Sequence, residues 1–183
     1  MKSRSAALFL IAPLALVACG GATPPPGGPS GAAAPNRIEV PLVARSGSKL
    51  SGSATFIEVK DGVKVRVQVA GAPPGKVATH VHEIGDCSAP DASSAGGHFN
   101  PAAKPHGLPA GSEHHLGDLG NIDIDADGAG STEVVVTGAT LKEGDPSSYL
   151  GRAIIVHEKQ DDGGQPVGNA GGRIGCGLIT EGK

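Results

Sequence analysis

The chain has 183 residues, with 15 Lys and Arg against 18 Asp and Glu, a formal net charge of −3 and 2% aromatic residues. Nucleic-acid binders need basic patches and, for single strands, stacking rings, so this composition argues against a nucleic-acid partner. The length suits a single folded domain.

The first 18 residues are typical of a bacterial signal peptide. Lys2 and Arg4 give a charged start, and residues 6–18 are almost wholly apolar but too short to cross a bilayer. The run ends in LVACG, which resembles a lipobox, in which Cys19 would be lipidated and become the first mature residue. An ordinary small-residue cleavage site with a nearby cysteine is the alternative.

Residues 20–36 read GGATPPPGGPSGAAAPN, and this Pro and Gly content predicts a flexible tether rather than a core. We expect residues 19–36 to anchor the following domain, 37–183, to a membrane of the bacterial cell envelope, facing the periplasm. Gly20 stands where an inner-membrane retention Asp would stand, so the outer membrane is the expected site.

Residues 37–183 predict an all-β domain. Lys64 and Arg66 alternate with Val65 and Val67, the pattern of a strand with one wet face, and an Asp-Gly hairpin signal precedes them. Eight short strands indicate a sandwich or barrel without an amphipathic helix, and the long loop over 85–119 is of the kind that usually carries function. The strands are expected at residues 38–44, 54–60, 63–70, 77–83, 121–125, 133–137, 152–158 and 173–180.

Three cysteines are an odd count for an exported protein. If Cys19 carries lipid, Cys87 and Cys176 remain as one pair, and an exported compartment permits a disulfide between them. Closing so long a loop would stabilise the fold by roughly 4–5 kcal/mol on the chain-entropy model.

His80 and His82 lie two residues apart in a predicted strand, so both imidazoles face the same side. A copper site suits four imidazoles, and tetrahedral zinc takes four ligands from His, Asp or Cys. The candidate set supplies seven side chains for these eight positions, so one bridging histidine would complete two sites. The candidates are His80, His82, His98, His106, His115, Asp118 and His157.

Five segments, THVHEIGDC, SAGGHFNP, HLGDLGN, GRAIIVHEKQDD and GNAGGRIGCG, resemble in order and spacing the signature blocks of the copper,zinc superoxide dismutases. The resemblance covers residues 37–180 and implies an eight-stranded Greek-key barrel with long metal-binding loops. It also implies disproportionation of superoxide to dioxygen and hydrogen peroxide by copper, with zinc in a structural role.

The resemblance implies a role for each matching residue. Arg173 would hold the anion beside copper, His98 would bridge the metals and carry a proton, and Asp161 would link His80 to His106. The pair Cys87 and Cys176 matches the family disulfide. The implied copper ligands are His80, His82, His98 and His157, and the implied zinc ligands are His98, His106, His115 and Asp118.

Other interpretations of these residues remain. Alone, His157 would be an ordinary strand histidine and Arg173 a surface charge, and the His-x-x-Asp spacing favours His115 over its neighbour His114 as the ligand. A metal-buffering lipoprotein without turnover and a non-enzymatic β-sandwich module are the competing functions. The short segment between His157 and Arg173 contains the uncharged run GGQPVGN, so we expect weak electrostatic steering from it, and the chain is expected to be a monomer or a homodimer.

Overall fold

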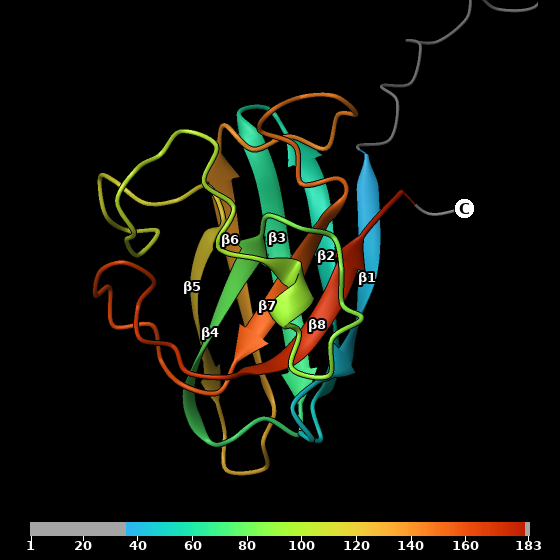
Figure 1. The fold of residues 1–183 in the computed structure, drawn as a ribbon, viewed down its shortest axis with the longest axis vertical. Helices are drawn as coiled ribbons and strands as arrows, with labels where there is room; N and C mark the ends of the chain where they lie inside the picture. Colours follow the sequence, from blue (N-terminus) through green and yellow to red (C-terminus); the bar gives the residue numbers. More distant parts are fainter. Residues whose placement is uncertain (1–35, 182–183) are drawn as a thin grey trace, which may run out of the picture. The chain divides into compact units, whose positions relative to one another are not determined.

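This computed structural model describes residues 36–181, so the expected signal peptide, Cys19 and most of the tether lie outside the described residues. Eight antiparallel strands close into a barrel in the order β1-β2-β3-β6-β5-β4-β7-β8 (Figure 1). The strands are β1 (Arg37–Ala44), β2 (Ser51–Val59), β3 (Gly62–Ala70), β4 (Gly75–His82), β5 (Asp118–Ile124), β6 (Gly130–Thr137), β7 (Arg152–His157) and β8 (Arg173–Ile179).

The barrel interior is built by strands that alternate apolar and polar residues. In β3, Val63, Val65 and Val67 are fully buried, whereas Arg66 between them is exposed. The expected all-β barrel of eight strands is confirmed, and its Greek-key character follows from the pairing of β3 with β6 and of β4 with β7. Among residues 36–181, no helix is long and apolar enough to span a bilayer.

Several strands begin earlier than the sequence pattern predicted. β2 includes the Ser51–Ser53 stretch, which has no apolar side chain but pairs in register with β3 up to Ala70. β5 starts at Asp118, inside the segment expected to be loop, because Asp118 pairs with His80 of β4. The remaining connection between β4 and β5 also contains a short 3-10 helix, η1 (Ser93–Ala95).

The outer side of β4, β7 and β8 is buried beneath a loop. The segment carrying η1 crosses in front of β7 and β8 (Figure 1), and its Ala92 and Ala95 pack on Ala153 and Ile155 of β7. The expected disulfide between Cys87 and Cys176 is confirmed, with 5.9 Å between the Cα atoms, and it fastens this segment to β8. A second, solvent-shielded region therefore lies outside the barrel wall.

Candidate metal centre and active-site cavity

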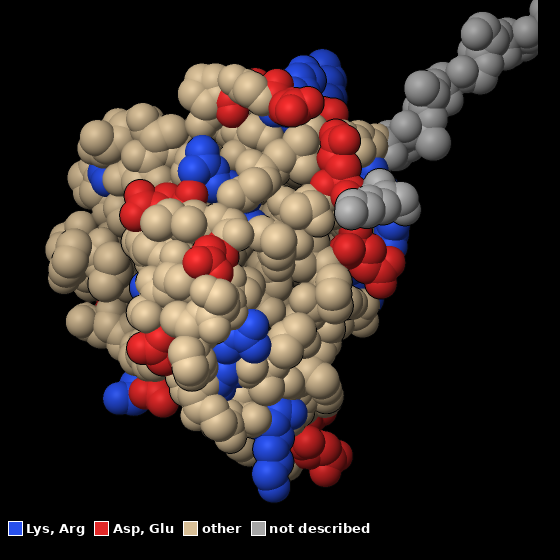
Figure 2. Space-filling model, turned by 45° about the vertical axis from the view of Figure 1, so that its right-hand side comes forward, with Lys and Arg blue, Asp and Glu red and all other residues tan. Residues whose placement is uncertain are grey.

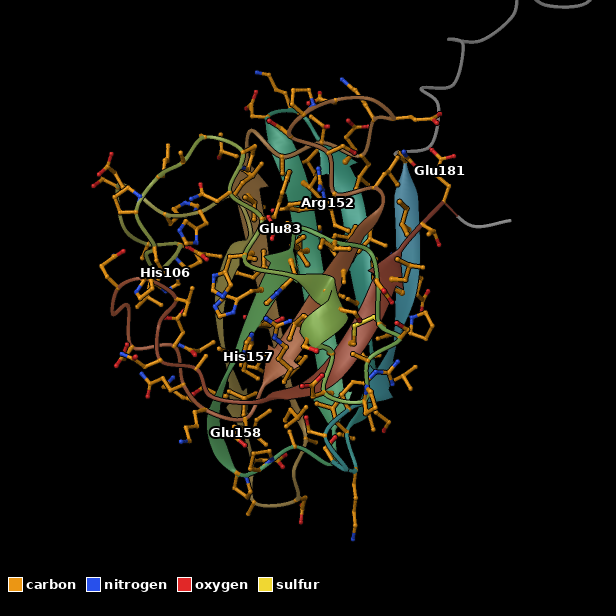
Figure 3. All side chains as sticks on the ribbon, in the orientation of Figure 1. Glu83, His106, Arg152, His157, Glu158 and Glu181 are labelled. Carbon is orange, nitrogen blue, oxygen red and sulfur yellow. A yellow bond between two sulfur atoms is a disulfide. The ribbon has the colours of Figure 1, made fainter. Side chains whose placement is uncertain are left out.

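Four histidines from three segments converge on the outer face of this wall. His80 and His82 leave β4 on the same side, His157 ends β7, and His98 lies in the loop, where it forms an isolated bridge with His82. One ring nitrogen from each lies within 4.8 Å of those of the others, and all four side chains are buried. Figure 3 shows His157 at the end of β7, with His106 approaching from the loop.

Each of the three strand histidines is oriented by a hydrogen bond from its outward nitrogen. His80 Nε2 donates to Asp161 Oδ2 at 2.8 Å, and His82 Nδ1 donates to the Gly96 carbonyl at 2.9 Å. His157 Nδ1 donates to the Gly171 carbonyl at 3.2 Å. The opposite nitrogens, His80 Nδ1, His82 Nε2 and His157 Nε2, are buried and have no hydrogen-bond partner among the described residues.

These inward nitrogens carry free lone pairs. Burial lowers the pKa of His80 to about 4, that of His82 to about 2 and that of His157 to about 3, so all three rings are neutral near pH 7. A neutral imidazole whose outward nitrogen donates must present a lone pair on the other nitrogen. Three buried lone pairs without partners, aimed at one region, fit a metal ion and suit no ordinary core.

A second group consists of His98, His106, His115 and Asp118, again with ligand atoms within 4.8 Å of one another. Asp118 Oδ1 lies 2.9 Å from His98 Nδ1 and 3.3 Å from His115 Nδ1, and the two Nδ1 atoms are 3.4 Å apart. His106 Nδ1 lies 3.0 Å from Asp118 Oδ2 without forming a hydrogen bond. Ligands about 2.0–2.1 Å from a tetrahedral ion are separated by roughly 3.3 Å, so these spacings fit zinc.

Asp118 enters this group as an anion. Its burial alone would raise the pKa, but hydrogen bonds from His98 and from the Gly107 amide hold the pKa of Asp118 below its usual value. The amide of His115 also donates to Asp118 Oδ2, at 2.8 Å. A charged carboxylate is the form that binds a cation.

His98 belongs to both groups. Its Nδ1 faces Asp118 and His115, so Nε2 is the nitrogen that it turns toward the first group. Its ring lies 4.0 Å from the His80 ring and 5.1 Å from the His82 ring, centroid to centroid. One imidazole thus lies between two potential metal sites with one nitrogen for each.

Asp161 connects the two groups by accepting hydrogen bonds from one histidine of each. Its Oδ2 accepts from His80 Nε2, and its Oδ1 accepts from His106 Nε2 at 3.0 Å and from the Gly163 amide at 2.8 Å. The side chain is fully buried; although burial alone would raise its pKa, the hydrogen bonds from His80 and His106 hold the pKa of Asp161 well below its usual range. The carboxylate therefore fixes one ring in each group.

The first group, called here the cavity group, borders an open cavity. A cavity of about 410 Å³ is lined by His82, His98, His157 and Arg173, together with Val167 and Asn169 of the segment before β8. Arg173 is the one lining residue, among those described, with a formal charge. Its Nη1 donates to the Ala92 carbonyl and its Nη2 to the Gly96 carbonyl, each at 2.7 Å. A larger hollow of about 580 Å³, at residues 143–152 and 180–181, contains no histidine.

Sequence reasoning missed the backbone partners of these side chains. The carbonyl of Gly96 accepts from both His82 and Arg173, and the side chain of Asn121 exchanges two hydrogen bonds with the Asp161 backbone, at 2.8 and 2.9 Å. The sequence does not indicate which backbone carbonyl will accept a hydrogen bond, although Gly96 lies in SAGGHFNP and Asn121 in HLGDLGN. His114, half-buried, is outside both groups and its Nδ1 donates to the His115 carbonyl.

The site can be compared with known proteins. A family model for copper/zinc superoxide dismutase matches residues 50–179. Superoxide dismutase (Cu-Zn) 1 of Aquifex aeolicus is 39% identical over 143 residues, which cover 75% of this chain and 84% of the relative. Superoxide dismutase (Cu-Zn) 2 of Mesembryanthemum crystallinum is also 39% identical, over 78% of this chain and 94% of its own length.

Solved structures agree with the fold. The clock protein EA4 matches with a TM-score of 0.71 at 38% identity, over 84% of this chain and 99% of its own. A SOD-like protein from Bacillus subtilis matches with a TM-score of 0.68 at 38% identity, over 77% of this chain and 97% of its own. Because the family model spans most of the chain and the relatives are close to 40% identical, the chain belongs to the copper/zinc superoxide dismutase family.

Proposed function

We propose that the chain is an enzyme that converts two superoxide anions and two protons into dioxygen and hydrogen peroxide. The observation that carries this proposal is the set of inward histidine nitrogens without partners beside a cavity that contains Arg173. The group of four imidazoles at the cavity suits copper, and the group that combines imidazoles with the Asp118 carboxylate suits zinc. The copper ligands would be His80, His82, His98 and His157, and the zinc ligands would be His98, His106, His115 and Asp118.

The residues around the cavity have distinct roles. When bound, copper would supply one-electron oxidation and reduction, while zinc would supply charge and a fixed geometry. Arg173 uses two of its five N–H groups on backbone carbonyls, which fixes the guanidinium plane at the cavity wall and leaves donors for a small anion. His98 can hold a proton at Nε2, the nitrogen facing the cavity group, and deliver it to the superoxide that is reduced to hydrogen peroxide.

The role of Arg173 is tested by Arg173→Ala. We expect the rate constant for superoxide removal to fall about tenfold or more, the effect of losing a charged hydrogen-bond donor to an anion. In Arg173→Lys the rate constant should fall less, because an ammonium keeps the charge but loses the planar pair of donors. Pulse radiolysis of fully metal-loaded protein measures the rate, and Arg66→Ala, on the exposed face of β3, is the matched control.

The outcomes separate the competing functions. Wild-type protein that carries both metals and does not remove superoxide would exclude a dismutase and favour a metal-buffering protein. An Arg173→Ala variant with the wild-type rate would leave the dismutase standing and remove Arg173 from the anion site.

The envelope location is part of the proposal and is supported by the sequence of residues 1–36 alone. Lipid on Cys19 would hold the barrel at the periplasmic side of a membrane, the outer one by the absence of Asp after Cys19. The anchored barrel would act as a monomer or a homodimer, which sedimentation of the mature protein distinguishes.

We expect Cys19→Ser to abolish incorporation of labelled palmitate and to move the processed protein from the membrane pellet to the soluble fraction, because Ser offers no thiol for the lipid. Ser30→Ala, in the same tether, is the control and should stay with the membrane. Continued lipid incorporation into the Cys19→Ser protein would show that the anchor lies elsewhere.

A further inference from the structure

The turn between β1 and β2 contacts the segment that carries the disulfide. Arg45 directs two of its N–H groups at one acceptor: Nε and Nη2 both donate to the Cys87 carbonyl, at 3.0 and 2.6 Å. Its Nη1 donates to the Ala44 carbonyl at 2.8 Å, which fixes the plane of the guanidinium. The carbonyl of a disulfide cysteine is thus held by a side chain 42 positions away in the sequence.

Ser46 adds two more contacts from the same turn. Its amide donates to the Pro90 carbonyl at 2.8 Å, and its hydroxyl donates to the Arg173 carbonyl at 2.9 Å. The residue has a φ of 55°, a left-handed conformation that is uncommon for a side chain other than Gly or Asn. The turn therefore joins two segments, one around Pro90 and the other at the start of β8.

The same two segments meet again at the active site. Residues 87–97, called here the disulfide segment, provide both carbonyls that orient the Arg173 guanidinium, from Ala92 and Gly96. The Gly96 carbonyl also accepts from His82. The position of Arg173 thus depends on where the disulfide segment lies on the barrel, and that segment has a covalent fastening at Cys87 and a polar one at Arg45 and Ser46.

We propose that Arg45 and Ser46 are positioning residues that hold the disulfide segment, and through it the Arg173 guanidinium, independently of the disulfide bond. The proposal rests on the proposed function, because it concerns the anion-holding arginine of that same cavity. The two fastenings act on one segment, so the loss of either should be partly compensated by the other. Non-additivity of this kind is the signature of residues coupled through a shared structure.

The test is a double-mutant cycle on copper- and zinc-loaded protein. Arg45→Ala is placed in the wild-type background and in a Cys87→Ser/Cys176→Ser background, and the Kd of azide, a small anion, is titrated through the visible copper absorption. We expect about a twofold increase in Kd with the disulfide present and about tenfold without it, since a charged hydrogen bond would then be the remaining fastening. Amide hydrogen exchange of residues 89–97 should accelerate in parallel.

Two further variants separate positioning from general stability. Arg45→Lys keeps the charge but donates through a single point, so it should lie between the wild type and Arg45→Ala. Ser46→Gly keeps the left-handed backbone and the amide bond to the Pro90 carbonyl, and it removes only the hydroxyl bond to the Arg173 carbonyl, so it should raise the azide Kd less than Arg45→Ala does. Arg66→Ala is the control for loss of a positive charge.

An azide Kd that is unchanged by Arg45→Ala in both backgrounds, with or without a lower melting temperature, overturns the proposal while leaving the dismutase proposal intact. Effects of the same size in both backgrounds also overturn it, because the fastenings would then be uncoupled. Failure of the wild-type protein to bind azide or to remove superoxide would instead contradict the proposed function itself.

Discussion

Removing both metals with a chelator should lower the melting temperature of the protein by roughly 20 °C in total. An ion present at a thousand times its Kd stabilises the folded state by about 4 kcal/mol, and a domain of this size loses roughly 2–4 °C per kcal/mol. The physical reason is the set of buried ring nitrogens on His80, His82, His106 and His157 that no protein donor satisfies. Without a cation, these lone pairs remain desolvated and unpaired.

The two ions should not contribute equally. The cavity group takes His80, His82 and His157 from β4 and β7, which are already paired strands. An ion there would therefore restrain only the loop that carries His98. The second group takes His98, His106 and His115 from the long loop and joins them to the start of β5. An ion there fixes loop residues that lie outside the paired strands, so zinc alone should restore more stability than copper alone.

Calorimetry of four forms under oxidising conditions measures these contributions: metal-free, zinc only, copper only and both. Metal content per chain, determined on the same samples, is the control against copper entering the second group. A copper-only form as stable as the zinc-only form would contradict the argument that the second ion fixes the loop.

The barrel and the ligand set could be predicted because both depend on patterns of side chains that are visible in the sequence. Alternation of Val with Lys and Arg predicted β3, and the two-residue spacing of His80 and His82 placed both rings on one face of β4. The start of β5 could not be predicted, because Asp118 belongs to the ladder through its pairing with His80 and not through any apolar pattern. Strand limits are set by partners that are distant in the sequence.

The fine geometry of the site also escaped prediction. The nitrogen that each ring presents is decided by its outward acceptor, and for His82 and His157 that acceptor is a backbone carbonyl. Arg45, in the turn after β1, has no local pattern that points to Cys87. Such contacts exist only once the disulfide segment is folded against the barrel, so a residue-by-residue reading of the chain has no signal for them.

Asp161→Asn should weaken copper binding about 10- to 100-fold and weaken zinc binding less, even though the two side chains have the same shape. An amide has one acceptor oxygen, whereas the carboxylate accepts from His80 on one oxygen and from His106 and the Gly163 amide on the other. The amide oxygen should take the Oδ1 position, because two donors meet there. The NH2 group would then face the N–H at His80 Nε2.

Two donors facing each other force the His80 ring to change its tautomer. With its proton on Nδ1, the ring would no longer present a lone pair to the cavity group, whereas His106 would keep its acceptor and its inward lone pair. Competition with chelators of known affinity, performed separately for each metal, measures the two constants. Asp127→Asn, an exposed residue in the turn between β5 and β6, changes the same charge and should leave both constants within about twofold. A larger loss of zinc affinity than of copper affinity in Asp161→Asn would reverse the inferred orientation of the amide and place the tautomer change on His106.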